Sequence, residues 1–252
     1  MVRKANQDAL GCFPELGLFV VADGMGGRSE GEVASRLAVE SIHAAMAPEL
    51  GAAAEDATEP PAERGGFWRS LRGTRSAADP GPDLEGAVGL ANRRVHEAGH
   101  SQPASPRGSM GTTVVVLVCV PQRQRAYWAH VGDSRLYRVR DGELALLTAD
   151  HTMFGEEFWG QGRVPPDLPH TNRLVRAVGI EPTVRATCGA DALQPGDLFL
   201  LCSDGVSGMV TPDELRQQLL DGQPLKETGE ALIRLALAAG GRDNASAILV
   251  RA

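Results

Sequence analysis

The stretch that most constrains this chain is a short apolar run that ends in an acidic residue and a cluster of glycines. Leu18 to Ala22 is rich in β-branched residues, which predicts a buried strand, and Asp-Gly-Met-Gly-Gly follows at 23–27. A carboxylate at the end of a buried strand is costly to desolvate without a positive partner. Glycine lets other groups approach the backbone closely. The pattern favours a hard cation bound by carboxylate and carbonyl oxygens, with an Asp-capped glycine turn as the simpler alternative.

Composition, net charge and cysteine spacing argue against several classes of protein. The chain has 252 residues, 42% of them hydrophobic and 23% charged, as in ordinary soluble globular domains. A net charge of −7 argues against nucleic-acid binding. The four cysteines lack C-x-x-C spacing, which argues against a zinc site and favours a reducing compartment. No segment reaches the roughly 18 apolar residues of a membrane span, and no signal peptide opens the chain. We therefore expect a cytoplasmic protein.

Helical patterns dominate the first part of the chain after the opening strand. A capping box at Ser29–Glu32 predicts a helix that ends near Pro48. Gly51 to Pro82 is rich in Ala, Gly, Pro and Arg and is expected to be a low-complexity surface loop. Apolar residues at three- and four-residue spacing from Leu84 to Val95 predict a second helix.

Strand patterns dominate the middle of the chain. Gly111 to Val120 is almost wholly apolar, which predicts a central strand covered on both faces. Arg125 to Val131 is expected to be the next strand, with Leu136 to Val139 returning as its hairpin partner. Asp141-Gly142 predicts another hairpin turn, which leads into a strand at Leu144 to Leu147.

The last part of the chain alternates strands and helices after an irregular segment. Asp150 to Asn172 lacks strand or helix periodicity and is interpreted as a flap-like insertion. The elements expected after it are strands at Thr183–Cys188, Asp197–Cys202 and Ala245–Val250, and helices that begin at the Thr211–Glu214 capping box and at Leu225.

Four acids share one kind of sequence setting. Asp23, Asp133 and Asp204 each lie at a predicted strand end beside glycine, and Asp243 lies just before a strand. Carboxylates that converge without cations repel one another and raise each other's pKa values. A pair of Mg²⁺ or Mn²⁺ ions would relieve that repulsion. Two such ions about 3.5–4 Å apart can share a carboxylate and a hydroxide, which suits in-line attack on phosphorus.

Seven short motifs occur in one order along almost the whole chain. They are R-x-x-x-Q-D at 3–8, VADGMGG at 21–27, GTT at 111–113, VGDSR at 131–135, ADHT at 149–152, SDG at 203–205 and RDNAS at 242–246. The set resembles the metal-dependent Ser/Thr protein phosphatases (PPM, type 2C) in their bacterial form. Each motif alone is weak, but the ordered set is highly specific.

The resemblance implies a fold, an activity and partners. The implied fold is α+β, a four-layer α-β-β-α sandwich of two mainly antiparallel sheets flanked by helix pairs, and residues 1–252 would be one catalytic domain. The implied activity is hydrolysis of phosphoserine and phosphothreonine in proteins by a metal-bridging hydroxide. Its substrates would be proteins phosphorylated by a bacterial Ser/Thr kinase, and the kinase itself. We expect a monomer that binds neither nucleic acid nor membrane.

The resemblance also implies a metal site with two Mn²⁺ or Mg²⁺ ions. Asp23 would bridge the two ions, and the backbone carbonyl of Gly24 would bind the second. Asp204 and Asp243 would complete the first.

Three further residues would act around that pair of ions. Asp8 would hold metal-bound water, and Arg3 would grip two phosphate oxygens through its planar guanidinium. Asp133, with Asp204, would reach a third and weaker ion. Taken alone, Asp133 is better interpreted as the cap of a β-turn. His151 and His130 are expected to be structural rather than metal ligands.

Several positions depart from the family pattern. Gln7 stands where many members have glutamate, Met25 where animal members have histidine, and Gly208 where many members have aspartate. The chain also begins almost at Arg3, where the family usually has a preceding strand. Gln7, Gly208 and the short N-terminus motivate an alternative, a catalytically weak or inactive scaffold or phosphoprotein-binding module on the same fold. The presence of Asp23, Asp204 and Asp243 argues against that alternative.

Overall fold

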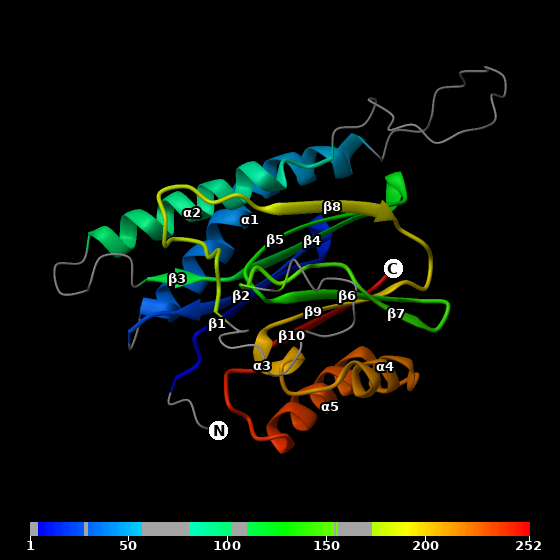
Figure 1. Cartoon of the computed structure of the whole chain (residues 1–252). Coiled ribbons are helices and arrows are strands. Elements are labelled where there is room, and N and C mark those ends of the chain that lie inside the picture. Colours follow the sequence, from blue (N-terminus) through cyan, green and yellow to red (C-terminus); the bar gives the residue numbers. More distant parts are fainter. Residues whose placement is uncertain (1–4, 28–29, 57–80, 102–109, 154, 156–172) are drawn as a thin grey trace.

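The structure has four layers, with two β-sheets face to face between two groups of helices (Figure 1). This computed structural model describes residues 5–27, 30–56, 81–101, 110–153, 155 and 173–252. The α+β sandwich expected from the sequence is confirmed. Among the described residues, no helix is long and apolar enough to cross a membrane.

The first sheet has six strands, all paired in antiparallel fashion. Five of them lie in the order β1-β2-β4-β5-β8, and the short β3 pairs with the end of β2. Their bounds are β1 Asp8–Phe13, β2 Leu18–Met25, β3 Gly111–Thr112, β4 Val114–Val120, β5 Arg125–Val131 and β8 Thr187–Ala192. Helices α1 (Glu30–Asp56) and α2 (Leu84–His100) cover its outer face.

The second sheet has four antiparallel strands in the order β10-β9-β6-β7. Their bounds are β6 Arg135–Arg140, β7 Glu143–Leu146, β9 Leu198–Cys202 and β10 Ala247–Arg251. The short α3 (Asp204–Ser207) follows β9, and α4 (Pro212–Leu220) and α5 (Leu225–Ala238) cover the outer face. Two 3₁₀ turns, Pro14–Leu16 and Pro121–Arg123, join β1 to β2 and β4 to β5.

The uninterrupted apolar runs follow from the layered packing. Successive side chains of a strand point to opposite faces. In β2, Leu18 and Val20 pack under α1 and α2, while Phe19 and Val21 pack between the sheets. The strands β4 and β9 alternate in the same way between two cores. The predicted two-sided burial of the strand at Gly111–Val120 is confirmed for Val114–Cys119, but the predicted single strand is divided at Thr113 into β3 and β4.

One predicted pairing is wrong. Leu136 to Val139 was expected to form a hairpin with Arg125–Val131, but β6 pairs with β7 and β9 in the other sheet. Gly132 has φ 105°, a left-handed conformation that favours glycine, and it turns the chain away from β5. The turn that carries Asp133 therefore joins the two sheets.

The first helix is longer than the sequence predicts. Helix α1 continues through Pro48 to Asp56, so residues 51–56 of the expected surface loop are helical. Beyond the proline, Leu50 is buried in the core under the first sheet, which compensates for the hydrogen bond that proline cannot donate. Residues 57–80 of that loop, and most of the flap-like insertion at 150–172, lie outside the described residues.

Two further strand predictions need correction. Strand β1 was not expected, because Asp8–Phe13 contains two small residues, Ala9 and Gly11, and no β-branched residue. The strand expected at Thr183–Cys188 instead spans Thr187–Ala192, where it pairs with β5.

Two turn and cap predictions are confirmed. Asp141 and Gly142 have φ 51° and 79° and join β6 to β7. At the start of α4, Thr211 Oγ1 accepts from Glu214 N at 3.3 Å, and Thr211 N donates to Glu214 Oε2 at 2.9 Å. This reciprocal pair is a capping box.

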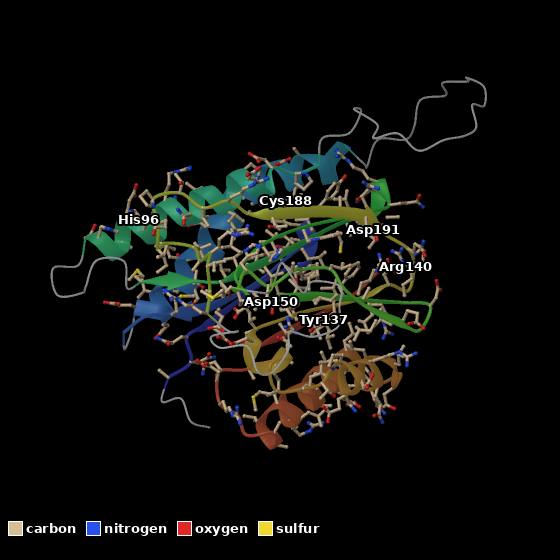
Figure 2. All side chains as sticks on the ribbon, in the orientation of Figure 1. His96, Tyr137, Arg140, Asp150, Cys188 and Asp191 are labelled. Carbon is tan, nitrogen blue, oxygen red and sulfur yellow. The ribbon has the colours of Figure 1, made fainter. Side chains whose placement is uncertain are left out.

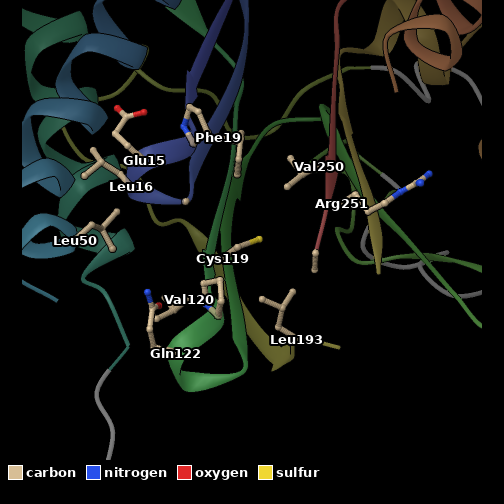
Figure 3. Close-up of a pocket in the computed structure, with 14 residues that line it drawn as sticks. Glu15, Leu16, Phe19, Leu50, Cys119, Val120, Gln122, Leu193, Val250 and Arg251 are labelled. Atoms are coloured by element: carbon tan, nitrogen blue, oxygen red, sulfur yellow. The ribbon is translucent and has the colours of Figure 1, made fainter. Parts of the chain in front are cut away.

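A pocket of about 330 Å³ opens between the layers at one end of the strands (Figure 3). It is lined by the start of β2, the end of β4 and the end of β10, including Phe19, Cys119 and Val250. The predicted acidic residues lie at the opposite ends of these strands. Asp23 is near the end of β2, whose start lines the pocket, and Asp133 follows the end of β5, which pairs with the start of β4. This pocket is therefore separate from the candidate site.

Candidate metal centre

Two of the predicted acids face each other across neighbouring strands. In the antiparallel β1–β2 pair, Asp8 lies opposite Asp23. Ser203, which precedes Asp204, donates from Oγ to Asp8 Oδ2 at 2.9 Å. The end of β9 in the second sheet is thereby joined to the edge strand of the first.

Electrostatics place two more acids beside this pair. The pKa of Asp23 is raised to about 10, first by burial and then by the negative charges of Asp8, Asp204 and Asp243. The pKa of Asp8 is also raised, mainly by burial and in part by the charge of Asp204. Carboxylates perturb one another in this way only when they are close and poorly solvated. The structure therefore brings Asp8, Asp23, Asp204 and Asp243 together.

The SDG and RDNAS motifs are joined by backbone and hydroxyl contacts. Ser203 N donates to Ser246 O, and Ser246 N donates to Ser203 Oγ, both at 3.1 Å. Asn244 N donates to Asp243 Oδ1 at 2.8 Å, which fixes that carboxylate. A Cβ on Gly205 would collide with the Asn244 carbonyl oxygen, so only glycine allows this approach.

Gly24 also lies where a side chain has no room. A Cβ there would collide with the Gly31 carbonyl oxygen and lie 2.6 Å from that of Gln7. Gly24 N donates to Gln7 O at 3.1 Å, and Gln7 N donates to Asn244 Oδ1 at 3.0 Å. Gln7 therefore joins β2 to the RDNAS motif through its backbone, whatever its side chain contributes.

Three hydroxyl residues position the end of β2, and this role was not predicted from the sequence. Asp23 N donates to Thr113 Oγ1 at 3.0 Å, and Thr112 Oγ1 donates to Asp23 O at 2.9 Å. Thr113 Oγ1 and Ser134 Oγ share a hydrogen bond at 2.6 Å. The GTT and VGDSR motifs contain these residues, so the available signal was their place in those motifs and, for Ser134, the neighbouring Asp133.

Asp133 lies at the turn between the sheets and is half-buried. Its pKa is raised to about 7, first by burial and then by the charges of Asp204 and Asp150. Arg135 donates two hydrogen bonds to Asp150, at 2.9 and 2.7 Å, and its charge only partly offsets the rise in the pKa of Asp133. Figure 2 labels Asp150. Asp133 thus belongs to the same electrostatic cluster as Asp204.

The donor set suits a hard divalent ion. Mg²⁺ and Mn²⁺ favour carboxylate, carbonyl and water oxygens, and Asp8 Oδ1 is buried without a hydrogen-bond partner among the described atoms. No three acidic, histidine or cysteine side chains in the described part of the chain already stand in ligand geometry around one point. Mg²⁺ usually retains several water ligands, so water can complete such a shell. Arg3, the predicted phosphate ligand, lies outside the described residues.

Two histidines near Asp133 have structural roles, as predicted from the sequence. His151 Nδ1 accepts from Gly132 N at 3.2 Å, and its Nε2 lies 3.0 Å from Thr187 Oγ1. His130 Nε2 donates to Ala149 O at 2.7 Å. The two rings stack with centroids 4.3 Å apart.

Acid is expected to destabilise the protein through His151. Burial, followed by the charges of His130 and Arg176, lowers the pKa of His151 from 6.5 to about 3. Below pH 6.5 the unfolded chain binds a proton that the folded chain does not, so stability is lost as the pH falls. The expected loss is about 1.4 kcal/mol per pH unit.

Urea unfolding at pH 7.5 and pH 5.5 measures this effect against a matched variant. His151→Asn keeps an acceptor for Gly132 N but cannot bind the proton. The difference in unfolding free energy between the two pH values should shrink by about 1 kcal/mol in the variant. An identical difference in both proteins would show that His151 is not held neutral.

Comparison with solved structures defines the class of this fold. The catalytic domain of the serine/threonine protein phosphatase PstP, solved with two manganese ions, matches 99% of this chain and 92% of its own with a TM-score of 0.75 and 29% identity. PppA of Pseudomonas aeruginosa, described as a regulatory component of T6SS, matches 100% of this chain and 92% of its own with a TM-score of 0.74 and 31% identity. Both share the whole architecture, so the chain has a Ser/Thr phosphatase fold.

The sequence comparisons show the family. The model of the protein phosphatase 2C family matches residues 3–249. The protein phosphatase PhpP of Streptococcus pneumoniae is 30% identical over 98% of this chain and 92% of its own length. The chain belongs to the protein phosphatase 2C family. PstP of Mycobacterium tuberculosis is also 30% identical, over 99% of this chain and 42% of its own length.

Proposed function

We propose that this protein hydrolyses phosphoserine and phosphothreonine in proteins with two Mn²⁺ or Mg²⁺ ions. The main supporting observation is the convergence of Asp8 and Asp23 in the first sheet with Asp204 and Asp243 beside the second, because the charges of these neighbours raise the pKa values of Asp8 and Asp23. Such a cluster is stable at neutral pH only with cations or bound protons. The relatives PhpP and PstP, to which this chain is similar in sequence, are named protein phosphatases.

Each residue of the acidic cluster would have a role set by its position. Asp23, whose carboxylate is reached by the charges of Asp8, Asp204 and Asp243, would hold the two ions together with Asp204, Asp243 and the Gly24 carbonyl. Bound there, the ions would supply an activated water as nucleophile and neutralise charge on the phosphoryl group. Asp8 would orient water through Oδ1, because Ser203 already occupies Oδ2. Arg3 would bind phosphate oxygens, and Asp133 with Asp204 would reach a third, weaker ion.

The biological setting forms part of the proposal. We infer that residues 1–252 act as one catalytic domain. The protein would be a cytoplasmic monomer that reverses phosphorylation by a bacterial Ser/Thr kinase. The alternative remains a non-catalytic phosphoprotein-binding module, which the departures at Gln7 and Gly208 motivate. Met25 cannot donate a proton, so water would protonate the leaving alkoxide here.

Hydrolysis of p-nitrophenyl phosphate with Mn²⁺ separates the two functions. The enzyme is expected to turn over with Mn²⁺ and to lose essentially all activity in EDTA, because the carboxylates alone cannot activate water. Returning Mn²⁺ in excess should restore the rate. A side-by-side assay on phosphopeptides and nucleotides tests the substrate class.

Two results would contradict the proposal. Turnover that survives EDTA would exclude the metal mechanism, and no turnover with either ion on phosphopeptides would favour the binding module. Preferential hydrolysis of nucleotides would assign the chemistry to small molecules.

A further inference from the structure

The C-terminal end of α2 carries a pair of histidines that the proposed function does not use. The sequence His-Glu-Ala-Gly-His at 96–100 places His96 and His100 one helical turn apart on one face. Their ring centroids are 4.0 Å apart. Figure 2 labels His96 towards this end of the helix. Spacing of this kind on a helix allows two imidazoles to bind one metal ion.

The hydrogen bonds of the two rings fix which nitrogen is available. His96 Nδ1 lies 3.1 Å from Gly179 O, and His100 Nδ1 lies 2.8 Å from His96 O. A carbonyl oxygen only accepts, so each Nδ1 must carry a proton and donate it. In the neutral rings, both Nε2 atoms are therefore left with a lone pair. Metal-binding histidines in proteins typically donate their other ring N–H in this way.

The loop beneath His96 is itself held firmly. Gly179 N donates to Asn92 Oδ1 at 2.7 Å, and Asn92 Nδ2 donates to Glu181 O at 3.0 Å. Val178 exchanges two backbone hydrogen bonds with Thr112, at 3.0 and 2.9 Å. A ligand supported by rigid neighbours loses little freedom when it binds a metal. The orientation of the His96 ring is thus fixed before any ion arrives.

We propose that His96 and His100 form a binding site for one divalent ion of the Zn²⁺, Ni²⁺ or Cu²⁺ type, separate from the acidic centre. Imidazole nitrogen suits these ions, whereas Mn²⁺ and Mg²⁺ favour oxygen. No third acidic, histidine or cysteine ligand joins the pair among the residues that the structure describes. Water would therefore complete the shell. Residues 96–100 also match the H-E-x-x-H pattern of zinc peptidases. Peptidase chemistry is not inferred from that pattern, because Glu97 is exposed at the helix surface.

Calorimetric titration of the untagged protein with Ni²⁺, in excess Mn²⁺ that occupies the acidic centre, tests the proposal. The wild-type chain is expected to bind one Ni²⁺. His100→Gln and His96→Gln should each weaken that binding about tenfold or more, because one of two protein ligands is removed. His43→Gln is the matched control, since His43 is a half-buried helical histidine stacked on Phe13 at 4.0 Å.

The variants keep the result interpretable. His100 is exposed, and among the described residues its hydrogen bond goes to its own helix, so His100→Gln should fold normally and retain Mn²⁺-dependent hydrolysis. Unchanged Ni²⁺ binding in His100→Gln would overturn the proposal. So would an equal loss in His43→Gln, or loss of Ni²⁺ binding in Asp204→Asn, which would place the ion in the acidic centre.

Discussion

Asp204→Asn is expected to lower the turnover of p-nitrophenyl phosphate by at least about a hundredfold at saturating Mn²⁺. The amide has the shape of the carboxylate but no charge. Asp204 perturbs Asp8, Asp23 and Asp133 electrostatically, so it lies within reach of all three. Loss of its charge would remove a ligand of the proposed ion pair.

Thermal unfolding with and without Mn²⁺ distinguishes loss of the metal from loss of the fold. Wild-type protein should gain stability with Mn²⁺, because an ion that binds only the folded state stabilises it. The variant should unfold at a temperature no lower than metal-free wild type, since one repelling charge is gone, and should gain little from Mn²⁺. Asp213→Asn, an exposed residue in the first turn of α4, is the matched control. Near-normal turnover of Asp204→Asn would remove Asp204 from the proposed site.

The largest expected effect on stability lies away from the acidic cluster, at Asp197→Ala. Asp197 is 1% exposed and accepts from Arg140 Nε and Nη2, both at 2.7 Å, and from Gln194 N at 2.9 Å (Figure 2 labels Arg140). Arg140 also donates to Ala192 O at 2.7 Å, so the pair ties β6 to the end of β8. Breaking such a buried pair is expected to lower the unfolding free energy by about 3 kcal/mol.

Urea unfolding at neutral pH measures this loss. Glu40→Ala is the control, because the Glu40 side chain is 62% exposed and 4.0 Å from Arg36, and exposed pairs contribute less than about 1 kcal/mol. Burial alone would raise the pKa of Asp197, but the contacts with Arg140 and Gln194 N hold it below its usual value. Its contribution is therefore present at neutral pH and is lost as the pH falls through that lowered pKa. A loss equal to that of Glu40→Ala would show that the pair is not structural.

Motif chemistry predicted the members of the cluster better than their neighbours. Asp23, Asp204 and Asp243 were recognisable because each sits in a short, unusual run of acid and glycine. The position of Asp8 opposite Asp23 was not predictable, because β1 has no β-branched residue and was not recognised as a strand. The hydroxyls of Thr112, Thr113 and Ser134 were missed, since hydroxyl residues are common in turns of any kind.

Local patterns also failed where tertiary packing decides. Proline normally ends a helix, but Leu50, two residues after Pro48, is buried in the core, and the helix continues. The turn at 132–134 has the composition of a hairpin, yet its chain crosses to the second sheet. Sequence-local signals describe single elements, whereas the choice of partner strand depends on which core has an unfilled face.

The opposition of Asp8 and Asp23 across β1 and β2 has a consequence for folding. Successive residues of a strand face opposite sides, so a slip of one position would turn Asp8 away from its neighbour. Without cations, the repulsion between the two carboxylates opposes the native alignment. Because an ion would bind only the correct alignment, it would stabilise the native pairing of β1 and β2 as well as act as a cofactor.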